Sequence, residues 1–155
     1  MSKDGLKDGF ELARTGRTLP MALLRAREAV MERFRPLLLS HDVTEQQWRV
    51  LRVLQEVGET DASQLAERAS ILAPSLTRII KTLETRGFIA TRKDPDDGRR
   101  SLVTLSADGA GFIREVTPDS AAIYAEIEAK IGKDRVNALL DELDFLLQAM
   151  AKGDA

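Results

Sequence analysis

The chain has 155 residues, of which 31% are charged, 43% hydrophobic and 5% aromatic, with a net charge of −2. This size suits one domain with a buried core, and the low aromatic content favours helix over sheet. The chain contains no cysteine and one histidine, which excludes disulfides, thiolate metal sites and thiol redox sensing. Among enzymatic mechanisms, catalysis by carboxylates remains an alternative. The N-terminus lacks a signal-peptide core, and no apolar run approaches the roughly 20 residues of a membrane span. We expect a cytoplasmic protein that is not an enzyme, with no cofactor, no metal and no membrane partner.

The charges are unevenly distributed along the chain. Residues 1–72 carry 11 basic and 11 acidic side chains, residues 73–105 carry seven and four, and residues 106–155 carry five and ten. A mildly acidic protein with one basic segment can bind a polyanion through that segment. A solvated surface with an uneven distribution of charge would give the same pattern, so the charge leaves both interpretations open.

The N-terminal part predicts an arm followed by a helix. Residues 1–17 are polar with no clear period, which indicates a flexible arm. A helix over residues 18–40 starts with Pro20 in its first turn, and Pro36 predicts an end or a kink near Arg35. Its apolar residues recur at helical spacing, namely Leu19, Leu23, Ala26, Val30, Phe34 and Leu37.

The second helix has a clear start signal. Thr44 and Gln47 have the spacing of a capping box, and Val43 and Trp48 have that of a hydrophobic staple. Gly58 is expected to end this helix.

Two shorter helices are expected next. Asp61 is predicted to cap the third helix, ASQLAERA, and Pro74 to open a fourth, PSLTRIIKTLETR, which Gly87 ends. In the fourth helix, Leu76, Ile79, Ile80 and Leu83 fall on one face, which is expected to be buried. The opposite face carries short hydroxyls and cations, namely Ser75, Thr77, Arg78, Lys81, Thr82 and Thr85.

The C-terminal half begins with two predicted strands, 88–92 and 101–105, joined by the polar turn KDPDDGRR. Ser106 is expected to cap a long fifth helix that Pro118 kinks. The last helix has apolar residues at heptad spacing, which predicts a dimerisation seam formed by Val136, Leu140, Leu143, Leu147 and Met150.

Helices followed by a two-stranded hairpin are typical of a winged helix-turn-helix, so the fold class is mainly α (α+β). We assign residues 41–105 to a DNA-binding lobe, with dimerisation helices at 18–40 and 106–155. The fourth helix would enter the major groove, where Ser75, Thr77, Arg78, Lys81 and Thr82 could reach phosphates and base edges. An ordinary solvated helix face is the alternative interpretation of these side chains.

The predicted wing supports DNA binding. Arg99 and Arg100 follow Asp96, Asp97 and Gly98 at the hairpin tip, and an arginine there can enter the negative minor groove. Asp97 could pair with Arg99 and hold its side chain extended. The acidic residues of the tip argue against simple charge attraction between the wing and DNA. Binding of the wing to DNA would therefore depend on the geometry of the tip.

The stretch PSLTRIIKTLETRGFI followed by DPDDGRRSLVTLSADG resembles the recognition helix and wing of the MarR family of transcriptional regulators. Asp97, Arg99, Leu105, Ser106 and Gly109 match the wing pattern of that family. The blocks ALLRAREAV, FRP, VTEQQWRVLRVL and RASILAPSLT resemble its branch of repressors of homoprotocatechuate (4-hydroxyphenylacetate) degradation operons. The likeness extends from about Leu19 to Met150 and leaves out the N-terminal arm.

The resemblance implies a homodimer that binds a palindromic operator in double-stranded DNA and is released by a phenolic or aromatic acid. It implies an effector site where the first and second helices meet, formed by Arg27, His41, Trp48 and Arg49. A cation for the carboxylate, an aromatic wall and a hydrogen-bonding histidine would suit such a ligand. The residues also allow simpler roles: Trp48 as a staple, His41 as a capping or loop residue, and the arginines in surface ion pairs.

Two alternatives from other classes remain open. An enzyme would need converging carboxylates, such as Glu45 with Asp42 or Glu84 with Asp96, and no spacing singles out such a pair. A winged-helix adaptor could bind protein without reading DNA. Specific DNA binding weakens steeply with salt, which an apolar protein contact does not, so salt dependence distinguishes the two.

Overall fold

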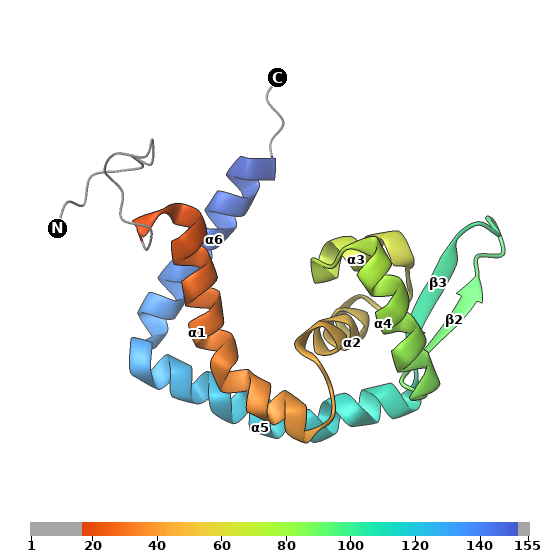
Figure 1. Ribbon diagram of the computed structural model, residues 1–155, viewed down its shortest axis with the longest axis horizontal. Helices are drawn as coiled ribbons and strands as arrows, with labels where there is room; N and C mark the ends of the chain where they lie inside the picture. The colour runs from red at the N-terminus through yellow and green to blue at the C-terminus, as the bar shows by residue number, and fades with distance from the viewer. Residues whose placement is uncertain (1–16, 152–155) are drawn as a thin grey trace. The chain divides into compact units, whose positions relative to one another are not determined.

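The computed structural model describes residues 17–151 (Figure 1). The chain divides into two compact units, Met1–Pro118 and Asp119–Ala155. The predicted arm, residues 1–17, lies almost wholly outside the described residues. The described part contains six helices and three strands, in the order α1 (Leu19–Ser40), α2 (Glu45–Val57), β1 (Thr60–Asp61), α3 (Ala62–Ala69), α4 (Ala73–Thr85), β2 (Ile89–Lys93), β3 (Ser101–Leu105), α5 (Ala107–Ile131) and α6 (Lys133–Ala151). This order confirms the predicted mainly α winged helix-turn-helix.

Helix α1 continues through Pro36 to Ser40, so of the two outcomes predicted near Arg35, an end or a kink, the end is wrong. A proline in a helix removes one backbone donor, and the loss of that bond does not end a helix whose last turns are held by other contacts. Here Phe34 and Leu38 are buried, and the backbone N–H of His41 closes the last turn on the Leu37 carbonyl at 3.2 Å.

Helices α2 and α3 begin at the caps that the sequence predicts. The Thr44 hydroxyl accepts from the Gln47 backbone N–H at 3.1 Å, and the Gln47 side chain accepts from the Thr44 N–H at 3.1 Å. The Asp61 carboxylate accepts from the Gln64 N–H at 2.8 Å and so begins α3. Gly58 ends α2 with a φ of +77°, a conformation that glycine adopts without strain.

Helix α4 packs by the predicted face. It begins at Ala73, one residue earlier than predicted, so Pro74 is its second residue and Leu72 its N-cap. Its face toward the core carries Leu76, Ile79 and Leu83, which are buried, and Ile80, which is half-buried. These join one core cluster with buried residues of α2, α3, the sheet and α5, among them Val50, Leu51, Leu54, Leu65, Val103 and Ile113. The buried apolar face therefore fixes the position of α4, and the opposite face of the helix is exposed.

The sheet has three antiparallel strands in the order β1-β3-β2. Strand β2 lies one residue later than predicted, and β3 has the predicted bounds. The two-residue strand β1, which pairs Thr60 with Val103, was not predicted, because two residues show no period. The β2–β3 hairpin extends beyond α4 as a wing (Figure 1).

A close approach fixes the start of α5. The Ser106 hydroxyl accepts from the Gly109 N–H at 3.0 Å, which confirms the predicted cap, and donates to the Gly87 carbonyl at 2.6 Å. A Cβ atom on Gly109 would lie 2.1 Å from the Phe88 carbonyl oxygen, so only glycine fits there. The segment between α4 and β2 is therefore joined to the start of α5 at this point.

The second unit contains the end of α5 and all of α6. Helix α5 continues through Pro118, the last residue of the first unit, and Gly132 separates it from α6 with a φ of +96°. No residue of α6 is buried within the described chain. None of the helices between residues 17 and 151 is long and apolar enough to cross a membrane.

Candidate nucleic-acid interface and pocket

The outward face of α4 presents the predicted polar side chains. Thr77, Arg78, Lys81 and Thr82 are exposed, and Ser75 is half-buried. The Thr77 and Thr82 hydroxyls each donate at 3.1 Å to a backbone carbonyl one turn back, as Thr85 does at 2.9 Å. With their protons used inside the helix, these hydroxyls act as acceptors toward an outside partner, and the two cations act as donors.

Arg99 extends from the tip of the wing. Its side chain is 95% exposed, and its Nε lies 3.5 Å from Asp97 Oδ1, which also accepts from the Arg99 backbone N–H at 3.0 Å. The predicted pairing of Asp97 with Arg99 is therefore confirmed. The aspartate therefore holds the turn, and the Arg99 guanidinium is exposed at the tip of the wing.

Arg100 differs from its neighbour, because its guanidinium is engaged at the base of the wing. Its Nη2 donates to Asp61 Oδ2 at 2.6 Å, and its Nε lies 3.7 Å from Asp94 Oδ2. The sequence predicted a DNA contact for Arg100 and missed this ion pair, since Asp61 is 39 positions away. In this structure Arg100 joins the wing to the N-cap of α3.

A second ion pair also braces the wing. The Arg92 guanidinium donates to Glu59 through Nη2 at 2.8 Å and Nε at 3.0 Å. This hydrogen bond lowers the pKa of the Glu59 carboxyl. The hydrogen bond from the Gln64 backbone, together with the charge of Arg100, lowers the pKa of Asp61 although burial opposes this. Both carboxylates are therefore stabilised in their charged form, next to the β1–β3 pairing.

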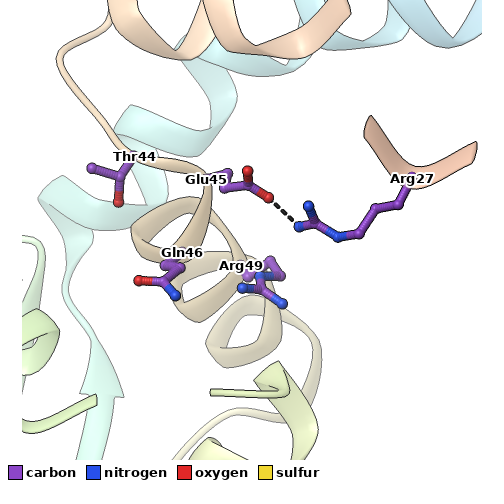
Figure 2. Close-up of a pocket in the computed structure, with 5 residues that line it drawn as sticks. All are labelled: Arg27, Thr44, Glu45, Gln46 and Arg49. Atoms are coloured by element: carbon purple, nitrogen blue, oxygen red, sulfur yellow. Dashed lines mark hydrogen bonds and ion pairs between the residues drawn. The ribbon is translucent and has the colours of Figure 1, made fainter. Parts of the chain in front are cut away.

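A pocket of about 440 Å³, open to solvent, lies where the start of α2 faces α1, lined by Arg27, Thr44, Glu45, Gln46 and Arg49 (Figure 2). Arg27 forms an ion pair with Glu45 across it, and Arg35 Nη2 lies 3.2 Å from Glu45 Oε1. Burial alone would raise the pKa of Glu45, but the hydrogen bonds from Arg27 and Arg35 outweigh it and lower that pKa. Glu45 is therefore a charged acceptor that occupies the Arg27 guanidinium.

The pocket brings together two of the four predicted effector residues. Arg49 lines it, and the Nε of Arg49 is buried without a hydrogen-bond partner among the described residues. His41 and Trp48 do not line it; their rings pack edge-on against Phe112, with centroids 6.2 and 6.3 Å away. The pocket therefore holds one cation, Arg49, that is not paired with Glu45, and the predicted aromatic wall, Trp48, packs instead against the buried cluster that contains Val43 and Phe112.

The C-terminal end of α4 makes aromatic and arginine contacts that the sequence did not indicate. Phe88 stacks on Phe112 with ring centroids 4.6 Å apart, and the Arg86 guanidinium carbon lies 4.8 Å from the Phe88 centroid. Arg86 also donates to the backbone carbonyl of Asp42, in the loop between α1 and α2. The C-terminal end of α4 is thus held to the loop that precedes the pocket.

The predicted seam of α6 lies in the second unit. Leu140, Leu147 and Met150 are 53%, 63% and 79% exposed, and Val136 and Leu143 are half-buried. This is more apolar exposure than an isolated surface helix normally carries.

Residues 43–101 match the MarR family model. The homoprotocatechuate degradative operon repressor of Escherichia coli is 37% identical over 82% of this chain and 86% of its own length. Two solved structures have the same fold: NadR in complex with 4-hydroxyphenylacetate (36% identity, TM-score 0.76, 87% of this chain and 96% of that one) and CouR bound to a 23-mer DNA duplex (25% identity, TM-score 0.79, 88% and 99%). The chain therefore belongs to the MarR family of transcriptional regulators, which are not enzymes.

Proposed function

We propose that this regulator is a repressor that binds a palindromic operator as a homodimer and leaves it when an aromatic acid binds. The observation that carries the proposal is the pairing of the exposed α4 face with a braced wing that presents Arg99. A helix fixed by its apolar face and a hairpin fixed by ion pairs give two rigid elements, as the reading of two adjacent grooves requires.

On DNA, α4 would lie in the major groove and the wing in the neighbouring minor groove. Arg78 and Lys81 would contact bases or phosphates, and the acceptor hydroxyls of Thr77 and Thr82 would face the amino groups of adenine or cytosine. Arg99, held by Asp97, would enter the minor groove. The engagement of Arg100 with Asp61 favours a bracing role for Arg100, and Ser75 would contribute at the edge of the interface. The CouR complex supports DNA binding as a property of a protein of this fold.

The homodimer is supported by apolar surface on each terminal segment. In α1, Leu19, Leu23, Leu24 and Val30 are between 38% and 51% exposed. In α6 the heptad-spaced residues from Val136 to Met150 are exposed or half-buried. A symmetric dimer would bury such faces and present two copies of α4 to two half-sites.

The effector would bind through its carboxylate in the pocket beside α2. Arg49 is the favoured partner, because it lines the pocket without an ion pair to Glu45, whereas Arg27 would first have to release Glu45. His41 and Trp48 do not line the pocket, so we assign them no direct contact with the carboxylate. The NadR complex with 4-hydroxyphenylacetate supports an aromatic acid as the ligand class. Binding must favour a state that fits the operator poorly, since equal affinity for both states shifts nothing.

Selection of binding sequences from random duplex DNA tests the proposal. We expect a palindromic site, bound with an affinity that falls steeply as salt rises. Calorimetry with 4-hydroxyphenylacetate should show binding to the wild type that Arg49→Ala weakens, with Arg52→Ala as a charge-matched control on the same helix. Failure to select any sequence would contradict operator binding and favour a protein-binding adaptor, and binding of the acid without release of DNA would contradict the effector role.

A further inference from the structure

The N-terminal tip of α4 is exposed and apolar. Leu72, its N-cap, is 79% exposed, and Ala73 and Pro74 after it are also exposed. The core-facing side chains of this helix begin only at Leu76. The cations Arg78 and Lys81 come later, so the tip of α4 (Leu72, Ala73 and Pro74) carries no charge.

Stability does not account for leucine at this position. An N-cap residue stabilises a helix when its side chain accepts a backbone N–H, as Thr44 and Asp61 do for α2 and α3. Leucine has no acceptor, and the N-cap of α4 makes no side-chain hydrogen bond. The side chain also remains in water, so it contributes little apolar burial. Serine, threonine or aspartate would stabilise this helix better.

The proposed docking supplies an apolar partner for the tip. In a helix-turn-helix, the first residues of the recognition helix contact the base edges of the major groove. Among those base edges the thymine C5-methyl is the apolar group, and the others are donors and acceptors that leucine cannot satisfy. We propose that Leu72 is a specificity-determining residue that contacts a thymine methyl group in each half-site. This inference rests on the proposed function.

Replacing thymine by deoxyuridine, one position at a time, in the selected operator tests this proposal. Deoxyuridine removes the methyl group and keeps the base pair. We expect wild-type protein to lose about fourfold in affinity at one thymine of each half-site, the factor for withdrawing one methyl-sized group from an apolar contact. Leu72→Ala should bind the thymine and deoxyuridine duplexes equally at that position.

Two further variants separate DNA reading from a structural role. Leu39→Ala removes a leucine that is also 79% exposed, at the end of α1, and should leave the thymine-to-deoxyuridine ratio unchanged. Leu72→Ser supplies the missing cap, so it should raise the thermal unfolding midpoint and still lose the discrimination. A structural leucine would not give higher stability together with lost selectivity.

Other outcomes would overturn the inference. If wild type and Leu72→Ala show the same deoxyuridine profile, Leu72 reads no methyl, while salt-dependent operator binding would leave the proposed function intact. If Leu72→Ala sediments as a monomer where the wild type is a dimer, the tip contacts a second copy of the chain instead. If no operator can be selected, the proposed function and this inference both fail.

Discussion

Arg100 Nη2 lies 2.6 Å from Oδ2 of Asp61, while Oδ1 of the same carboxylate accepts the backbone N–H of Gln64. One aspartate therefore caps α3 and holds the base of the wing. Its side chain is 11% exposed, so water competes weakly for it. This contact ties the wing to the helix-turn-helix through Arg100, the residue next to Arg99.

Arg100→Ala should loosen the wing. Removing the guanidinium leaves one oxygen of a largely buried carboxylate without its partner, at a cost of about 1 kcal/mol, because Arg100 itself is half exposed. We expect a lower urea midpoint together with weaker operator binding. An unchanged midpoint would show that the ion pair does not brace the wing.

Arg99→Ala should affect DNA binding alone. Its side chain is 95% exposed, so its removal should change the free energy of unfolding by less than about 0.5 kcal/mol. Loss of a groove contact should weaken operator binding by about 1–3 kcal/mol in a gel-shift titration at fixed salt. Lys130→Ala, an exposed residue of α5, removes the same charge and serves as the control. If the two variants lose the same operator affinity, Arg99 contributes only a nonspecific positive charge to DNA binding.

The pH dependence of stability should report the Asp61 contact. The hydrogen bond from Gln64 and the charge of Arg100 lower the pKa of Asp61 below its ordinary value of 3.8. A lowered carboxyl pKa adds stability that is present above the ordinary value and is lost as the pH falls through the lowered one. Asp61→Asn keeps an N-cap acceptor and removes the charge. Urea unfolding at about pH 6 and about pH 3 should show a smaller decrease for Asp61→Asn than for the wild type. Equal decreases would mean that Asp61 does not contribute.

Leu143→Asp should disrupt the dimer. It places a charge in the middle of the apolar seam of α6, where burial against a second copy would be strongly unfavourable. We expect a monomer in sedimentation and a loss of operator affinity of about a hundredfold, since two half-site contacts no longer combine. Gln148→Asp adds the same charge at an exposed position of α6 and should stay dimeric. A wild-type monomer would refute the seam.

The sequence predicted those contacts in which the two partners lie within a few residues of each other. The capping box of Thr44 and Gln47, the Asp61 cap and the pairing of Asp97 with Arg99 all depend on spacings of two or three residues. Such geometry can be read from the chain because the backbone of a helix start or a tight turn fixes it locally.

The features that were missed depend on the tertiary fold. The ion pair of Arg100 with Asp61 spans 39 residues and the bond from Arg86 to the Asp42 carbonyl spans 44, so no local pattern indicated either. The effector site was predicted as one group, but Trp48 packs edge-on against Phe112 and does not line the pocket. The helix end predicted at Pro36 did not occur, because the tertiary contacts that bury Leu38 hold the last turn of α1.

If α4 and the wing bind operator DNA through their cations, the affinity must depend on the salt concentration. The logarithm of the association constant should fall linearly with the logarithm of salt concentration, and Lys81→Ala should reduce the slope by about one. Arg78→Ala should in addition weaken preference for the selected operator over random DNA. Affinity that is independent of salt, with both variants equal to the wild type, would show that these cations do not bind the operator.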